Sequence, residues 1–319
     1  LLLNNPATSD CAGCHAALDA RLPDTGLLNA GDWVRDHPQF RPLAVAGFTG
    51  GEARLARVSL DRRPEDRNGL IFSHAQHLSP QNAVARMAVR LADYGKPLRC
   101  RDCHRQDESG TGFLAIEMER DCGACHSLAV ADASGRVVNL PHAEPEKVVA
   151  LMLGTRPPPV PRPAVAGAAR VIPGPGLASP GPAQSALARA RTPFLRGGAC
   201  RDCHEIRPES APGRLDFQVA PVHLTDRFYL QSHFPHGAHE EMRCRACHEA
   251  TTSERAEDLL LPAIATCREC HGNAEWAARH PKANASGDCA TCHWFHPDSR
   301  TPAFAELEKQ VRNRQLALR

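Results

Sequence analysis

Apolar residues recur at helical spacing in only a few short stretches of the chain. Residues 80–95 (PQNAVARMAVRLADYG) and 145–153 (PEKVVALML) each predict a short helix. The tail, residues 301–319, predicts another, with its apolar side chains on one face. Elsewhere the sequence has little sustained periodicity, apart from short helices expected after several motifs described below. The expected fold is therefore mostly coil with short α-helices and little or no β-sheet.

One long tract has a composition that disfavours packed helices. Residues 154–199 contain 10 of the 27 prolines, together with many Ala and Gly residues. Such a composition favours extended polyproline segments and is typical of a linker. The predicted organisation is an N-terminal lobe, residues 1–153, and a C-terminal lobe, residues 200–319, joined by this linker.

A five-residue pattern, CxxCH, occurs seven times, three times in the N-terminal lobe and four times in the C-terminal lobe. The seven copies use all 14 cysteines, so none is left over. The cysteines are Cys11, Cys14, Cys100, Cys103, Cys122, Cys125, Cys200, Cys203, Cys244, Cys247, Cys267, Cys270, Cys289 and Cys292.

This spacing decides among the usual roles of cysteine. A disulfide framework has no reason to place His after every second Cys, a thioredoxin-like motif needs one copy only, and a zinc ribbon pairs one CxxC with another. CxxCH is the signature of covalent c-type haem attachment, in which two thiols form thioethers to the porphyrin and the adjacent His is the proximal iron ligand. We therefore expect seven haem c groups, with iron bound by His15, His104, His126, His204, His248, His271 and His293.

The composition agrees with a core made of cofactor. Aromatic residues are only 5% of a chain of 319 residues, which would ordinarily bury a large aliphatic and aromatic core. We expect the flat apolar macrocycles to be the core, with the chain wrapped around them. The chain without haem is expected to have no stable fold.

Haem attachment also predicts a compartment. In bacteria and archaea it takes place outside the cytoplasm, so we expect a periplasmic or extracellular protein, including one at the cell surface. The opening LLLNNPATSD is too short for a signal peptide and is expected to be either a processed start or the first residues seen. No run of 18 apolar residues predicts a transmembrane segment in this chain, although an anchor could lie outside it.

The formal net charge of +2 does not indicate nucleic-acid binding. Each haem adds about two propionates and a ferric core of about +1, so the oxidised holoprotein would carry about −5. Of the 38 basic residues 34 are Arg, which fits either guanidinium clamps on propionates or, for most of them, the codon bias of a GC-rich genome.

Ten histidines lie outside the motifs and can supply a second axial ligand to all seven irons. Iron with two histidine ligands suits electron transfer, whereas catalysis at haem usually needs an open position. The four methionines are not needed as ligands. The sequence therefore indicates an electron carrier with bis-histidine haems rather than an enzyme.

A second pattern, FxHxxH, repeats as FSHAQH at residues 72–77 and FPHGAH at residues 234–239. Each copy precedes a series of CxxCH motifs, which indicates an internal repeat. Two His three residues apart on a helical turn point to a similar side but cannot easily both reach one iron. They should bind two different haems and hold those haems close together.

FxHxxH before a series of CxxCH motifs resembles the class III cytochromes, the cytochrome c3 and c7 group, over residues 72–126 and 234–296. The second stretch, with three following motifs, looks especially like the trihaem c7 type. The resemblance implies that His236 binds the haem of Cys244 and Cys247 and that His239 binds another haem of the same cluster. It implies likewise that His74 serves the haem of Cys100 and Cys103, while His77 belongs to the same motif. The insert at residues 78–99, the isolated N-terminal motif and the extra motif at Cys200 depart from the family pattern.

Three more distal ligands are needed. His142 and His296 resemble positions found in multihaem c3-like chains, and His296 is assigned to a haem neighbouring that of His293. His37 is the only spare histidine in the segment of the N-terminal haem and completes the set. His223, His233 and His280 are expected to have other roles, such as hydrogen bonds to propionates or carbonyl groups.

These features predict single-electron transfer along seven haems between redox protein partners. One alternative is a monomeric periplasmic shuttle, and another is a homopolymer, an extracellular filament in which haems continue across subunits. A multihaem oxidoreductase with an open haem is a third alternative, disfavoured because every motif ends in His and distal ligands are in surplus.

Overall fold

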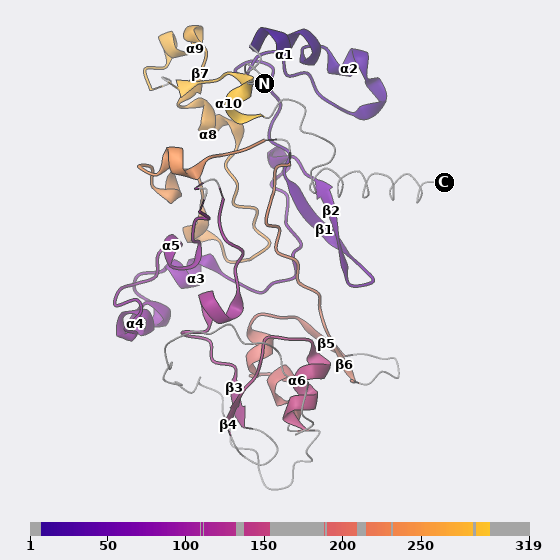
Figure 1. Cartoon of the computed structure of the whole chain (residues 1–319), viewed down its shortest axis with the longest axis vertical. Helices are drawn as coiled ribbons and strands as arrows, with labels where there is room; N and C mark the ends of the chain where they lie inside the picture. Colours follow the sequence, from indigo (N-terminus) through magenta and orange to yellow (C-terminus); the bar gives the residue numbers. More distant parts are fainter. Residues whose placement is uncertain are drawn as a thin grey trace.

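In a computed structural model, the residues described are 8–108, 110, 112–131, 137–153, 188, 190–208, 215–230, 232–282 and 285–293. They form an elongated molecule whose small elements follow one another along its long axis (Figure 1). Within these ranges, no helix has the length and apolar character that crossing a bilayer requires.

The N-terminal segment lies at one end of the molecule. It forms α1 (Thr8–His15), α2 (Leu18–Arg21) and the 3-10 turn η1 (Pro23–Thr25). Helix α1 contacts α10 (Cys289–Cys292), the last described helix, and Figure 1 shows the two side by side. The first and the last CxxCH motifs are therefore neighbours in space.

A β-hairpin follows, in which β1 (Leu43–Thr49) pairs antiparallel with β2 (Glu52–Arg57). Two glycines form its tip, with φ of 59° at Gly50 and 86° at Gly51. Two consecutive residues with positive φ make the two-residue turn whose twist matches a hairpin, which is why the chain reverses here.

The middle of the molecule carries the first FxHxxH segment and the next two motifs. Ser73 caps α3 (His74–Leu78), because its side chain accepts a hydrogen bond from the Gln76 amide. Asn82 caps α4 in the same way and accepts from the Ala85 amide. The elements are η2 (Leu60–Arg62), α3 (His74–Leu78), α4 (Ala83–Arg90), α5 (Cys100–Cys103) and the π-helical turn η3 (Met118–Cys122).

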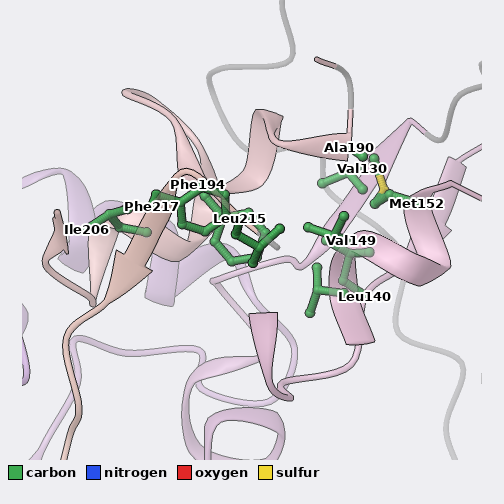
Figure 2. Close-up of a cluster of buried hydrophobic side chains, with 10 residues drawn as sticks. Val130, Leu140, Val149, Met152, Ala190, Phe194, Ile206, Leu215 and Phe217 are labelled. Atoms are coloured by element: carbon green, nitrogen blue, oxygen red, sulfur yellow. The ribbon is translucent and has the colours of Figure 1, made fainter. Parts of the chain in front are cut away.

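The opposite end holds the main cluster of buried apolar side chains, shown in Figure 2. Its elements are β3 (Ala129–Ala131), β4 (Val137–Asn139), α6 (Pro145–Met152), η4 (Thr192–Phe194), η5 (Ala199–Asp202), β5 (Ile206–Pro208) and β6 (Phe217–Val219). Strands β3 and β4 pair antiparallel, as do β5 and β6. Met152 of α6 is 1% exposed and Phe194 is 3% exposed, so residues from far-apart segments close one core.

The second FxHxxH segment and the last three motifs return along the molecule toward α1 (Figure 1). They form η6 (His236–His239), η7 (Cys244–Ala246), η8 (Ala250–Thr252), α8 (Ile264–Arg268), β7 (His271–Gly272), α9 (Ala274–Arg279), β8 (Ala285–Ser286) and α10 (Cys289–Cys292). Strands β7 and β8 pair in parallel.

The observed architecture differs from the sequence-based expectation in its sheets and in its packing. Instead of little or no β-sheet, the described residues contain four small two-stranded sheets, of which β1–β2 is the longest. The apolar cluster also crosses both expected boundaries, since it joins α6 to Phe194 and to Phe217. Helices lie in two of the three stretches expected from periodicity, at Ala83–Arg90 and Pro145–Met152. Most of the expected linker and the whole tail helix lie outside the described residues.

Candidate metal centres

The CxxCH motifs, numbered one to seven in chain order, fold as single tight turns. In five of them the amide of the motif His donates to the carbonyl of the first Cys, four residues earlier, over 2.8–2.9 Å. One such turn places residues i, i+3 and i+4 on the same side, so both thiols and the imidazole face one region. All 14 cysteines are free thiols.

Five motif histidines face a second histidine from elsewhere in the chain. The distances between ring centroids fall between 5.8 and 6.3 Å. The pairs are His74–His104, His77–His126, His142–His204, His239–His271 and His37–His293.

This separation suits one metal ion between two imidazoles. Two metal–nitrogen bonds of about 2 Å each, plus about 1 Å from each nitrogen to its ring centre, give about 6 Å between centroids. The Nε2 atoms of His142 and His204 are 3.5 Å apart. Two nitrogens this close together can both bind one metal ion.

Hydrogen bonds orient these rings from behind. The Nδ1 atom of five candidate ligands lies 2.6–3.2 Å from a backbone carbonyl oxygen. Since a carbonyl only accepts, Nδ1 is the donor and Nε2 keeps its lone pair for a metal. The contacts are His37–Pro38, His77–Ser73, His239–Pro235, His248–Leu260 and His271–Ser286.

The local environment keeps several of the rings neutral. Burial lowers the pKa of His37, His74, His126 and His204 below its ordinary value. At His74, the nearby His104 and His77 lower the pKa further, while Asp258 opposes them. A neutral imidazole is the form that binds metal, so the sites favour ligation over protonation.

A phenylalanine positions the two histidines of each FxHxxH segment. Phe72 stacks on His77 at 4.4 Å and meets His74 edge-on at 4.9 Å. Phe234 stacks on His239 at 4.4 Å and meets His236 edge-on at 4.7 Å. The two copies therefore share one arrangement of three rings. The repeated Phe was visible in the sequence, but its part in orienting both rings was not foreseen.

The residues at hand fit an apolar cofactor with polar edges. Phe113 and Phe234 are each 41% exposed beside His236 and offer apolar surface to a macrocycle. The buried hydroxyl of Tyr229 has no hydrogen-bond partner, and burial raises the pKa of Tyr229, with a further contribution from nearby Cys267. A buried orphan donor next to the sixth motif suits a propionate.

The structure relocates one predicted ligand. His37 was expected at the N-terminal haem because it lies in the same segment, but it faces His293 of the seventh motif. The segment just before His37 lies against the sixth motif, where the indole nitrogen of Trp33 donates to the His271 carbonyl over 2.9 Å. Closeness in the sequence did not predict the partner of His37, because the contact between Trp33 and His271 joins residues far apart in the chain.

The remaining predicted ligands differ in what surrounds them. His15 has no ring contact with another described residue, and His236 contacts Phe113 and Phe234. His296 lies outside the described residues. Of the histidines given other roles, His280 stacks on Trp276 at 3.6 Å and His223 donates its amide to the Asn68 carbonyl.

In the part of the chain that the structure describes, no three His, Cys, Asp or Glu side chains converge as a metal-binding group, so the histidines meet in twos. The chain matches no protein-family model, and comparisons with curated proteins and with solved structures likewise found no match.

Proposed function

We propose that this chain is a multihaem c-type cytochrome that passes single electrons along seven covalently attached bis-histidine haems. The observation that carries the proposal is the set of five histidine pairs, each joining a motif histidine to a distant histidine at the separation of two axial ligands. Bound haem iron would supply the one-electron redox chemistry.

The chain's own residues would hold and insulate the groups. The thiols of each motif would fix the porphyrin edge, and the motif His would lie under it. The distal imidazole would close the opposite face and leave no position for a substrate. Carbonyl groups behind the rings, such as Ser73 O and Leu260 O, would keep ligand orientation constant during a change of charge.

A second candidate function, that of an oxidoreductase with an open haem, has one observation in its favour. Among the described residues, neither His15 of the first motif nor His248 of the fifth faces another histidine ring. An iron held there by one axial ligand would bind small molecules, as in an oxidoreductase.

The two forms of the electron-transfer proposal, a monomeric shuttle and a filament, differ in assembly state. Negative-stain microscopy of native material distinguishes them.

The test is to express the protein with the haem-attachment machinery and to measure its mass and spectra. Seven haem masses per chain and a low-spin ferric spectrum are expected. Reduced protein should bind little carbon monoxide, with two equivalents at most if the first and fifth sites are open. A chain that carries no covalent haem would contradict the proposal.

A further inference from the structure

Several backbone contacts of the two FxHxxH segments match one another. The residue just before each Phe donates its amide to the second Cys of a later motif, as Ile71 N to Cys203 O and His233 N to Cys292 O, both at 2.9 Å. The residue before that forms an isolated β-bridge with the motif His, as Leu70 with His204 and Ser232 with His293. The fourth and seventh motifs therefore occupy equivalent places.

The same equivalence holds for the histidine pairs. The second His of each segment faces the second motif that follows it, with ring centroids 6.1 Å apart and planes at 39° for His77–His126, and 6.0 Å and 41° for His239–His271. Motifs two, three and four thus form one unit with FSHAQH, the Phe72 half. Motifs five, six and seven form the other with FPHGAH, the Phe234 half.

Other contacts place the motifs in the same order within each half. Helix α5 of the second motif contacts η3, which ends at Cys122 of the third motif. The amide of His142, which lies beside the fourth motif, donates to the Glu119 carboxylate in η3 over 3.4 Å. In the other half, the amide of Gly287, just before the seventh motif, donates to the carbonyl of Gly272, just after the sixth, over 3.0 Å. Together with the His77 and His239 contacts, these bonds place the middle motif of each half between the other two.

The two halves meet through their first motifs, and the contact is reciprocal. Ala75, just after the first His of FSHAQH, donates its amide to Ser253 O beyond motif five over 2.8 Å. Gly237, at the matching place in FPHGAH, donates to Gly110 O beyond motif two over 2.9 Å. Each half holds the other by the same bond, as across a twofold axis. The thiols of Cys100 and Cys244 lie close together at this junction.

We infer that the seven haem sites form one unbranched row in the spatial order four, three, two, five, six, seven, one. Two equivalent three-site halves meet head to head in this row, and the first site caps the end at α1 and α10. The inference rests on the proposed function. Electrons would enter and leave at the fourth and first sites. Every electron that passes from one half to the other would cross between the second and fifth sites.

The row differs from chain order at a place that can be tested. In chain order the fourth site would have two neighbours, the third and the fifth, whereas in the proposed row it is an end with one neighbour. Seven variants, each with both cysteines of one motif replaced by Ala, would be compared by proton NMR of the oxidised protein, where haem methyl signals are resolved. The signals that vanish identify the site removed, and those that shift identify its neighbours.

The expected result is that Cys200→Ala with Cys203→Ala shifts the signals of one other haem. Removal of the second site, by Cys100→Ala with Cys103→Ala, should shift two haems, those of the third and fifth sites. Two shifted haems in the first case, or an unshifted fifth site in the second, would overturn the order. Haem counting by mass comes first, because absence of haem in the wild type would defeat the proposed function, whereas seven haems with another neighbour map would defeat the order alone.

Where a cysteine variant does not fold, a ligand exchange gives the same information. His142→Met retains the thioethers and the motif His of the fourth site while raising its potential. Among the other haems, only the third site should show shifted NMR signals. The order of iron atoms in a cryo-electron microscopy map of the wild-type holoprotein decides the matter without any variant, and a fourth iron lying between the third and fifth would overturn the order.

Discussion

The Phe72 and Phe234 halves share their internal contacts but differ in what encloses their first sites. His74 has the carboxylate of Asp258 nearby, whereas His236 meets the ring of Phe113 at 4.7 Å. Asp258 and Phe113 lie at similar places, ten and nine residues after the motif histidines His248 and His104. The arrangement of Phe and two His rings is thus common to the halves, while the residues around each first site differ.

The local backbone shows the same division between fixed and variable features. Segment 74–78 is α-helical with a Ser73 cap, and segment 236–239 is a 3-10 turn after Pro235, which has no capping side chain. Both nevertheless place an Nδ1 atom against the carbonyl four residues earlier, at 2.8 Å for His77 and 3.2 Å for His239. Ring orientation is therefore retained although the helical hydrogen bonding is not.

The largest expected effect comes from withholding haem attachment. Ten of the 17 buried apolar residues in the described chain belong to the cluster around α6, so the histidine-bearing parts of both halves have little apolar core of their own. Hydrogen exchange of the unattached chain should show loss of protection in residues 72–126 and 234–293 alike. Protection equal to that of the holoprotein in either range would show that the chain itself holds that half together.

Next in size is removal of one distal ligand from each half. His74→Ala and His236→Ala should each leave one iron per chain open, because the Phe of each segment orients the two first histidines in the same way. Carbon monoxide binding by the reduced variants should rise by about one equivalent per chain. His223→Ala, an exposed control, should leave it unchanged. A response from only one of the two ligand variants would break the equivalence.

A smaller effect is expected from acidification, which should destabilise the two halves to different extents. Burial lowers the pKa of His74, His126 and His204 in the Phe72 half and of His37, which serves the Phe234 half. Below the ordinary histidine pKa of about 6.5 the unfolded chain binds protons that the folded chain does not, so stability falls as the pH drops. Thermal unfolding followed by absorbance should shift down by about 5 °C or more between pH 7 and 5. The loss of stability should be larger in the Phe72 half, which holds three of these four histidines, and an equal loss in both halves would contradict this.

The smallest expected effect is a change of potential at the second site. Asp258→Asn removes a negative charge near His74 and keeps an oxygen that can accept from the Ser253 hydroxyl, now 2.9 Å away. Loss of the charge destabilises ferric iron relative to ferrous iron, so the potential should rise by tens of millivolts. Asp24→Asn, exposed in η1 far along the chain, is the matched control. A redox titration with no change at the second site would show that charge does not distinguish the halves.

The sequence predicted features that depend on short spacing. CxxCH is one turn of chain, and FxHxxH is one more, so motif cysteines, proximal histidines and the division of His74 and His77 between two partners could be anticipated locally. The pairing of His37 with His293 depends on the path of more than 200 residues and on the Trp33 anchor. The hairpin at residues 43–57 was missed because its apolar alternation is interrupted, although Gly50-Gly51 is a turn signal.

The reciprocal bonds from Ala75 and Gly237 are those that two identical chains would form in a twofold dimer. Here one polypeptide supplies both partners, which makes the contact intramolecular and independent of protein concentration. Dilution therefore cannot separate the halves. A protein released into a large external volume would keep the central link of the proposed electron path at concentrations where a dimer of two separate chains would dissociate.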